Sequence, residues 1–338
     1  MALATSYKSF DEVKELFDPD TRIEQEAVFC EKFDKISSFH IVFHTSCICL
    51  LIFQASIFLS LVMSNPKSPY VAALLFSCIL TLFSYLILLF YYRTKKPQDF
   101  LDLRRFFVQA CRKQIASKKP FQDEHLFLAK AAESLTNKIG KNQFYFKKQS
   151  SMGALLQLLR FKDVEKMQEL LMYAAIQEHI EIIKKDPLDG RTHLSLAKAY
   201  LSMVKLYQSP LEESFSRIWI VQRILQSEKR QRRVEAAITL AMEELKIGLN
   251  SFPDDTWALL ELANCYKAIN DLHQELSCLV KLQQFIPNDE TLLLRLGKLF
   301  FLLGKTAEGL DIFSKLKNLN VHLSFELIDS YNAYLKNI

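Results

Sequence analysis

The sequence predicts an all-α protein, in which a two-helix transmembrane hairpin is followed by a solenoid of stacked helical repeats. Three observations support this fold class. Glycine is scarce, at 7 of 338 residues, as is typical of chains with few tight turns. Two long apolar stretches are separated by a short polar segment. The second half of the chain repeats one residue pattern, most clearly at 254–287 and 288–321, which indicates a repeat architecture.

The transmembrane hairpin is predicted over residues 40–92, with spans at 41–63 and 70–92. Neither span contains Asp, Glu, Lys or Arg. As a helix, each would be about 35 Å long, enough to cross a hydrocarbon layer of about 30 Å. Apolar residues cover all sides of both helices, whereas a surface helix of a soluble protein carries a polar stripe. The alternative, a helix pair buried in a soluble core, lacks enough remaining chain to enclose it.

The segment "SNPKSP" at 64–69 is predicted to connect the two spans. Pro66 and Pro69 stop helices, and Ser and Asn favour turns. Because the connection is so short, the spans must be antiparallel, and both long flanks lie on the same side. Cations follow the second span directly, so the positive-inside rule places both termini in the cytoplasm. We expect a multi-pass membrane protein, most simply of a bacterial inner membrane.

Residues 1–39 are expected to form cytosolic amphipathic helices before the membrane. The segment holds five Lys or Arg and nine Asp or Glu, a net charge of −4. Ser9 and Glu12 have the spacing of a capping box. Farther along, Ile23, Ala27 and Phe33 fall on one helical face. These faces are predicted to pack on the cytosolic part of the protein.

Residues 93–121 are predicted to form a basic juxtamembrane helix. Five apolar residues share one of its faces: Phe100, Leu103, Phe107, Cys111 and Ile115. Five cations are candidates for contact with anionic lipid headgroups: Arg93, Lys95, Lys96, Arg104 and Arg105. Two interpretations stay open, because the helix could lie on the membrane surface or pack its apolar face on the next helix. Nucleic-acid binding is not expected, since the nearby membrane explains the basic run more simply.

The repeats are clearest at 254–287 and 288–321. In the first, Leu259, Leu262, Ala263 and Tyr266 stand at positions 6, 9, 10 and 13. Four residues stand at the same positions of the second: Leu293, Leu296, Gly297 and Phe300. This spacing resembles the tetratricopeptide repeat, with its period of about 34 residues and its large-x2-large-small-x2-aromatic first helix. Glu275 departs from the pattern, because it occupies a position where that family has a small residue.

The resemblance extends, more loosely, over a repeat domain at 122–338. Residues 188–253 are interpreted as one repeat with elongated helices or as two repeats, one of them degenerate, and 324–338 as a terminal cap. The helix expected before Pro187 is interpreted as part of an atypical first repeat, with Asp163 as its N-cap.

The resemblance implies a function in protein binding. Tetratricopeptide grooves bind peptides or helices, and their lining comes from the first helix of each repeat. On that basis the candidate partner-binding residues are Asn264, Lys267, Arg295 and Lys298. The expected partner is therefore a protein or peptide held in the helical-repeat groove.

No catalytic, cofactor-binding or metal-binding motif is found in the sequence. Walker, GxGxxG, HExxH, GxSxG and CxxC patterns are missing. The seven cysteines have the spacing of neither a disulfide framework nor a zinc site. His40 and His44 are four residues apart, but no third ligand accompanies them. We therefore expect neither an enzyme nor a cofactor.

Together these features predict a membrane-anchored scaffold or adaptor that presents a protein-binding surface to the cytosol. Two alternatives remain open. The hairpin resembles the bilobed hydrophobic segment of chlamydial inclusion-membrane proteins, which implies type III secretion into a host-derived vacuole membrane. An assembly factor or chaperone for an envelope or secretion complex would also fit.

Overall fold

The computed structural model describes residues 19–64, 69–115, 121–142, 151–208 and 220–335. Regular structure in these residues is entirely helical, so the predicted all-α class is confirmed. The chain divides into two compact units, Met1–Ala175 and Ile176–Ile338. Three sequence features lie outside the described residues: the capping box at Ser9 and Glu12, the connection around Lys67, and the segment 209–219.

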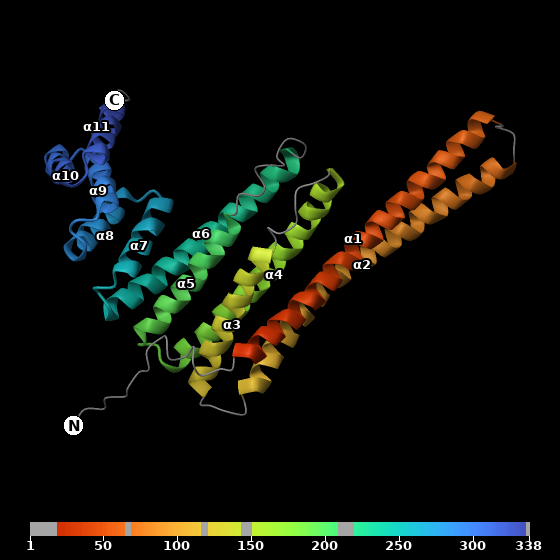
Figure 1. Cartoon of the computed structure of the whole chain (residues 1–338), viewed down its shortest axis with the longest axis horizontal. Coiled ribbons are helices and arrows are strands. Elements are labelled where there is room, and N and C mark those ends of the chain that lie inside the picture. Colours follow the sequence, from red (N-terminus) through yellow and green to blue (C-terminus); the bar gives the residue numbers. More distant parts are fainter. Residues whose placement is uncertain (1–18, 65–68, 116–120, 143–150, 209–219, 336–338) are drawn as a thin grey trace. The chain divides into compact units, whose positions relative to one another are not determined.

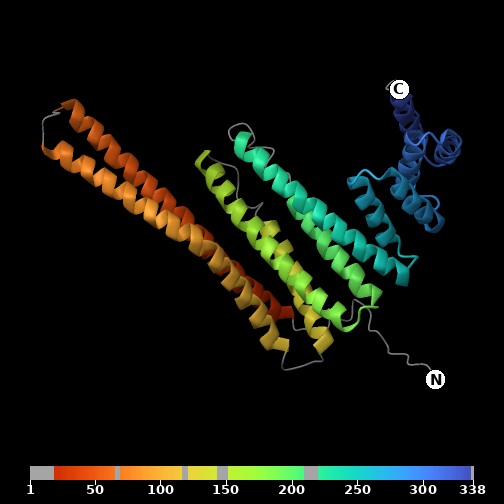
Figure 2. The same ribbon diagram turned by 180° about the vertical axis from the view of Figure 1, so that it is seen from behind.

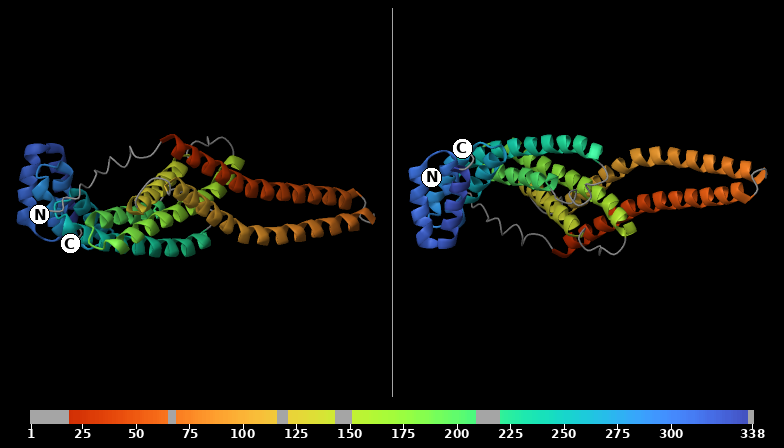
Figure 3. Two further views of the ribbon diagram at one scale, coloured as in Figure 1. Left: turned by 90° about the horizontal axis from the view of Figure 1, so that it is seen from below. Right: turned by 90° about the horizontal axis from the view of Figure 1, so that it is seen from above.

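The first unit begins with two long helices, α1 (Pro19–Ser64) and α2 (Pro69–Ile115). They lie side by side, as the red and orange ribbons of Figure 1 and both views of Figure 3 show. By length and composition, both are apolar enough to cross a membrane. The structure differs from the expected boundaries, because each helix continues through the change of polarity near residues 40 and 92. α2 even passes Pro97 without ending.

Side chains of α1 and α2 interlock along their length. Near the middle of both helices the Phe39 and Tyr92 rings are 5.7 Å apart, and the Phe43 ring is 4.8 Å from Tyr92. Farther along, Gln54 Nε2 donates a hydrogen bond of 3.1 Å to Thr81 Oγ1. A hydrogen bond between polar side chains is favourable among apolar surroundings, because water is not there to satisfy either group. These contacts fix the register of the helix pair.

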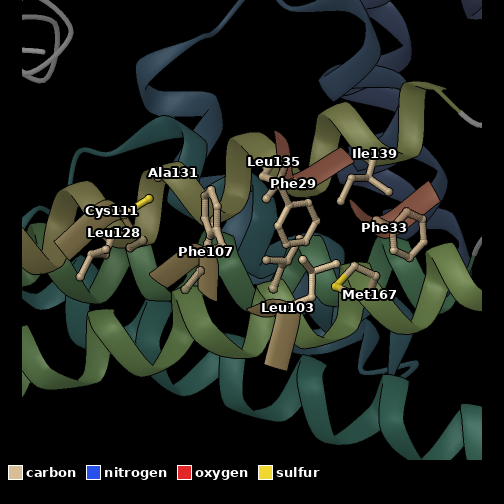
Figure 4. Packing of buried hydrophobic residues seen from close by; sticks show 14 of the residues in the cluster. Phe29, Phe33, Leu103, Phe107, Cys111, Leu128, Ala131, Leu135, Ile139 and Met167 are labelled. Atoms are coloured by element: carbon tan, nitrogen blue, oxygen red, sulfur yellow. The ribbon is translucent and has the colours of Figure 1, made fainter. Parts of the chain in front are cut away.

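The hydrophobic core of the first unit lies at the N-terminal part of α1 and the C-terminal part of α2, where both helices also carry charged residues. Helices α3 (Phe121–Asn142) and α4 (Ser151–Lys185) complete it. Figure 4 shows the Phe29 ring of α1 against Phe107 of α2, with ring centres 5.5 Å apart and Leu135 of α3 beside them. Of the five apolar residues on one face of α2, the four whose surroundings are described are buried here: Phe100, Leu103, Phe107 and Cys111. This face therefore packs on protein, which decides between the two interpretations of residues 93–121.

The second unit contains the end of α4 and seven further helices. They are α5 (Gly190–Tyr207), α6 (Ile220–Ser251), α7 (Thr256–Ala268), α8 (Leu272–Phe285), α9 (Glu290–Leu302), α10 (Thr306–Leu319) and α11 (Val321–Leu335). Each boundary of α9 and α10 follows the corresponding boundary of α7 and α8 by one repeat of about 34 residues. α7 packs on α8, α9 packs on α10, and α11 packs on both α9 and α10. Figure 2 shows these short helices in blue tones.

The turns inside the two short pairs also repeat. Asn270 has φ 61° and Gly304 has φ 72°, and the two residues occupy the same position in successive repeats. Each follows a first helix in the left-handed conformation that commonly ends a helix, which Gly and Asn adopt most easily. Small residues fit the close packing: a Cβ added at Gly297 would lie 2.6 Å from Leu327 of α11. The repeat is thus visible in boundaries, turns and packing.

Residues 188–253 form a single helix pair, α5 and α6, within the described part of the chain. α6 is one helix of 32 residues, and α5 packs along it. Both helices are longer than each of the helices α7 to α10. Asp189 begins α5 by accepting a hydrogen bond of 3.1 Å from the backbone N–H of Arg191. The buried His193 ring lies 2.5 Å from Glu244 of α6, so a polar contact joins the pair.

Aspartate side chains also begin three further helices in this unit. Asp255, Asp271 and Asp289 accept hydrogen bonds from the backbone N–H of Ala258, Gln274 and Leu292. The Thr291 hydroxyl and the Leu292 N–H both donate to Asp289, and they hold the pKa of its carboxyl below the usual range. Because the carboxylate is the better acceptor, the ionised form of Asp289 stabilises the start of α9.

We expect this cap to make stability depend on pH in the acidic range. The pKa of Asp289 is lowered in the folded state, so its contribution is complete above the unfolded-state pKa of about 4. The contribution is lost as the pH falls through the lower, folded-state pKa. Asp289→Ala should cost about 1 kcal/mol at pH 7 and much less at pH 2. Urea unfolding of both proteins at each pH measures this, and an equal cost at both pH values would contradict it.

Candidate binding surface

Arg295 of α9 lies at the centre of a polar network that joins three helices. Its Nε and Nη2 both lie 2.7 Å from Glu275 Oε1 of α8. Nη1 donates a hydrogen bond of 2.7 Å to Asn264 Oδ1, and Nη2 donates one of 3.2 Å to the carbonyl of Ala263 in α7. Two of the predicted partner-binding residues, Asn264 and Arg295, are therefore brought together, but they bind each other.

Glu275 explains why Arg295 is held so firmly. The Glu275 side chain is only 2% exposed, and that of Arg295 is 22% exposed. A buried carboxylate is costly unless it is paired and hydrogen-bonded. Glu275 departs from the repeat pattern, and the arginine on the first helix of the next repeat compensates for it. Sequence reasoning missed this pair, because the two residues lie on different helices and their separation carries no local periodic signal.

The other two predicted residues lie apart from this network. Lys298 of α9 reaches across to α11, where its Nζ lies 2.7 Å from Glu326 Oε1. That lysine holds the pKa of Glu326 below its usual value through its hydrogen bond and its charge. Lys267 is exposed on α7 and makes no side-chain hydrogen bond or ion pair within the described residues. Among the four, Lys267 is the one most available to another molecule.

The five predicted membrane-surface cations have different environments. Arg93 and Lys95 are exposed, and Lys95 Nζ lies 5.5 Å from the centre of the Tyr91 ring. Arg105 pairs with Asp102 one turn earlier in α2, at 3.2 Å. Arg104 is half-buried. The structure thus leaves Arg93 and Lys95 as the outward-facing cations nearest the uncharged stretch.

Lys96 has a different role from its neighbours. Its Nζ lies 2.6 Å from Asp163 Oδ1, and the same carboxylate accepts a hydrogen bond of 2.7 Å from the Ser37 hydroxyl. Asp163 is buried, and it lies inside α4 because that helix begins at Ser151. The predicted N-cap at Asp163 is therefore wrong. The carboxylate instead connects α1, α2 and α4, where a charged group must be paired to remain buried.

Two buried thiols of the second unit, Cys265 and Cys278, are poor nucleophiles. Burial, with a smaller contribution from Glu261, raises the pKa of Cys265 to about 12. Burial is also the main cause that raises the pKa of Cys278. A thiol with a raised pKa remains protonated near neutral pH, and the thiolate is the reactive form. Among the residues that the structure describes, no three His, Cys, Asp or Glu side chains are grouped as metal ligands.

No protein-family model matches the chain, and the search of curated proteins gives no match.

Proposed function

We propose that the protein is a membrane-anchored helical-repeat scaffold that holds a protein partner at the cytosolic face. The proposal rests on one observation: the same chain contains two long apolar helices and a set of helix pairs that repeats. The first feature supplies an anchor, and the second supplies an extended surface. Neither feature requires catalysis.

The anchor is supported by how α1 and α2 display their apolar residues. Ile52, Phe53, Phe83 and Phe90 are among many large side chains in the apolar stretches that are exposed. Transfer of apolar surface from water gives roughly 25 cal/mol per Å², so lipid is a favourable environment for such helices. Contiguous exposed apolar surface of this extent is rare on soluble monomers. We therefore propose that the uncharged parts of α1 and α2 span a membrane.

The register of the two helices supports one common boundary for the membrane. The Phe39 ring of α1 contacts Tyr92 of α2, and the nearest cations on each helix are Lys35 and Arg93. Lys35 and Arg93, the cations that border the two uncharged stretches, therefore lie at a similar level along the axis of the helix pair. Tyrosine at this level suits the interface between water and lipid. Both flanks then lie on the same side, which the positive-inside rule identifies as the cytoplasm.

Only some of the basic residues are in reach of lipid headgroups. In a continuous helix, Arg104 lies about 18 Å beyond Tyr92 along the axis. The headgroup layer is only about 5–8 Å deep on each side of the hydrocarbon. We propose that Arg93 and Lys95 contact anionic headgroups, that Lys96 holds Asp163, and that Arg104 and Arg105 lie beyond the headgroups. A bacterial inner membrane and a host-derived vacuole membrane both remain compatible with this proposal.

The binding role is supported by the recurrence of helix boundaries in α7 to α10, where the second pair repeats the first. The interval matches the tetratricopeptide period of about 34 residues, and the stacked first helices of that family line a groove for peptides or helices. We propose that the exposed polar side chains of α7 and α9 contact the partner. Lys267 and Lys298 would make direct contacts, while Asn264 and Arg295 shape the surface.

Charge reversal of Lys267 and Lys298 tests the binding role. The double variant Lys267→Glu/Lys298→Glu should weaken capture of the partner about tenfold, because repulsion replaces attraction at two sites. The measurement is affinity purification of the tagged chain from mild detergent extracts of its own membranes, with quantification of each co-purifying protein.

A matched control is Lys315→Glu on α10, whose side chain is exposed and pairs only with Asp311 of the same helix in the described structure. It should retain the partner. One stable partner lost in the double variant supports the scaffold, whereas many weakly bound clients favour an assembly factor or chaperone. Equal recovery of every protein from both variants would contradict the proposed surface.

A further inference from the structure

A hollow of about 420 Å³ opens in the second unit beside α6, α7 and α8. Its floor includes Leu259 and Leu262 of α7 and Cys278 of α8, all of them buried residues. Phe285 stands at its edge with much of the ring exposed. The volume falls within the range of about 300–1,000 Å³ that is typical of ligand sites, and apolar residues form the floor of such sites.

Two lysines flank this apolar floor from different helices. Lys246 comes from α6 and Lys281 from α8. Both are exposed, and neither pairs with a carboxylate within the described part of the chain. Lys246 lies 5.6 Å from the centre of the Tyr266 ring, which orients its ammonium group. Asp254 is the acidic residue among those that line the hollow, so the rim carries a net positive charge.

None of the four predicted partner-binding residues is among the residues that line the hollow. Leu262 lines the hollow, whereas Asn264 belongs to the network around Arg295. Two positions along a helix correspond to a rotation of about 200°, so the two side chains point in nearly opposite directions. The hollow is therefore separate from the surface of α7 and α9 that is proposed above.

We propose that this hollow is a second docking site, which takes a short acidic segment of a partner protein. A bulky apolar side chain of that segment enters the hollow above Leu259 and Leu262. Carboxylates next to it in the sequence pair with Lys246 and Lys281. The charge of the rim selects an acidic segment, and the apolar floor selects an aromatic or aliphatic anchor. The inference rests on the proposed role in protein binding, but it needs neither the α7–α9 surface nor the membrane.

Short synthetic peptides test this assignment on the full chain in detergent micelles. The probe is fluorescein-labelled Asp-Glu-Phe-Asp-Glu, and the readout is fluorescence anisotropy. Its two comparisons are Asp-Glu-Ala-Asp-Glu, which lacks the anchor, and Lys-Lys-Phe-Lys-Lys, which reverses the charge. The acidic phenylalanine peptide should bind at least about tenfold more tightly than either comparison, and 0.5 M salt should weaken it. Equal binding of all three peptides would overturn the proposal.

Two variants locate the binding on the protein. Lys246→Glu/Lys281→Glu should weaken the acidic peptide about tenfold, whereas Lys315→Glu should leave its affinity unchanged. Unchanged affinity in the double variant would overturn this location. If these tests fail while Lys267→Glu/Lys298→Glu still releases the natural partner, the proposed scaffold function stands and only the second site is lost.

Discussion

Replacement of Arg295 by methionine is expected to destabilise the second unit by about 3–5 kcal/mol, the usual cost of breaking a buried ion pair. The substitution keeps most of the apolar stem but removes the charge that balances Glu275, whose side chain is 2% exposed. Loss of one partner of a buried ion pair leaves the other charge without compensation, which is the costly outcome. Asn264 Oδ1 and the Ala263 carbonyl lose a donor as well. Urea unfolding monitored by circular dichroism measures the effect.

Two further variants separate this cause from a general loss of packing. Arg295→Met/Glu275→Leu removes both charges and should recover most of the lost stability, because well-packed apolar pairs often replace buried ion pairs without cost. Lys298→Met breaks the exposed pair with Glu326 and should destabilise the protein far less than Arg295→Met does. If Arg295→Met and Lys298→Met destabilise the protein equally, Glu275 is not the buried charge on which this explanation depends.

The double variant Ile52→Asp/Leu82→Asp is expected to abolish stable insertion into the membrane. Both side chains are exposed, at 61% and 47%, near the middle of the uncharged stretches. One aspartate at the centre of a membrane-spanning helix costs about 2.5–3.5 kcal/mol, and here each helix carries one. Extraction of isolated membranes with alkaline carbonate should release the double variant, while the unsubstituted protein stays in the pellet.

The matched control is Leu188→Asp/Leu310→Asp, which changes two exposed leucines outside the apolar stretches. It should remain in the membrane pellet like the unsubstituted protein. Should the unsubstituted protein itself be released by carbonate, the apolar surfaces of α1 and α2 must be covered by protein, and the proposed anchor would be rejected.

Much of the helical architecture could be predicted from local sequence patterns. The period between Pro253 and Pro287 and the small residues Ala263 and Gly297 give the positions of α7 and α9 within a few residues. Such features are local, because turns, caps and close helix contacts depend on residues only a few positions apart. The boundaries of α1 and α2 were harder to predict. Polarity changes near residues 40 and 92, but a helix can continue from an apolar environment into water.

The polar contacts between distant segments could not be predicted. Asp163 meets Lys96 and Ser37, which are far from it in the sequence, and Arg295 meets Glu275 across a turn. Each of these residues alone looks like an ordinary solvated charge on a helix. Only the packing of the helices shows that the carboxylates of Asp163 and Glu275 are buried. Two cations that were predicted to lie on the surface, Lys96 and Arg295, neutralise them. Lys267, Arg93 and Lys95 remain exposed among the predicted contact residues.

The most direct test of the central claim is the membrane topology of the chain. Three single-cysteine variants are needed in a background without the seven natural cysteines: Ser6→Cys, Lys67→Cys and Asn337→Cys. Intact cells are treated with a membrane-impermeant maleimide before and after permeabilisation. The account predicts that Lys67→Cys is labelled from outside, and that Ser6→Cys and Asn337→Cys are labelled only after permeabilisation. Labelling that places positions 6 and 337 on opposite sides of the membrane would contradict it.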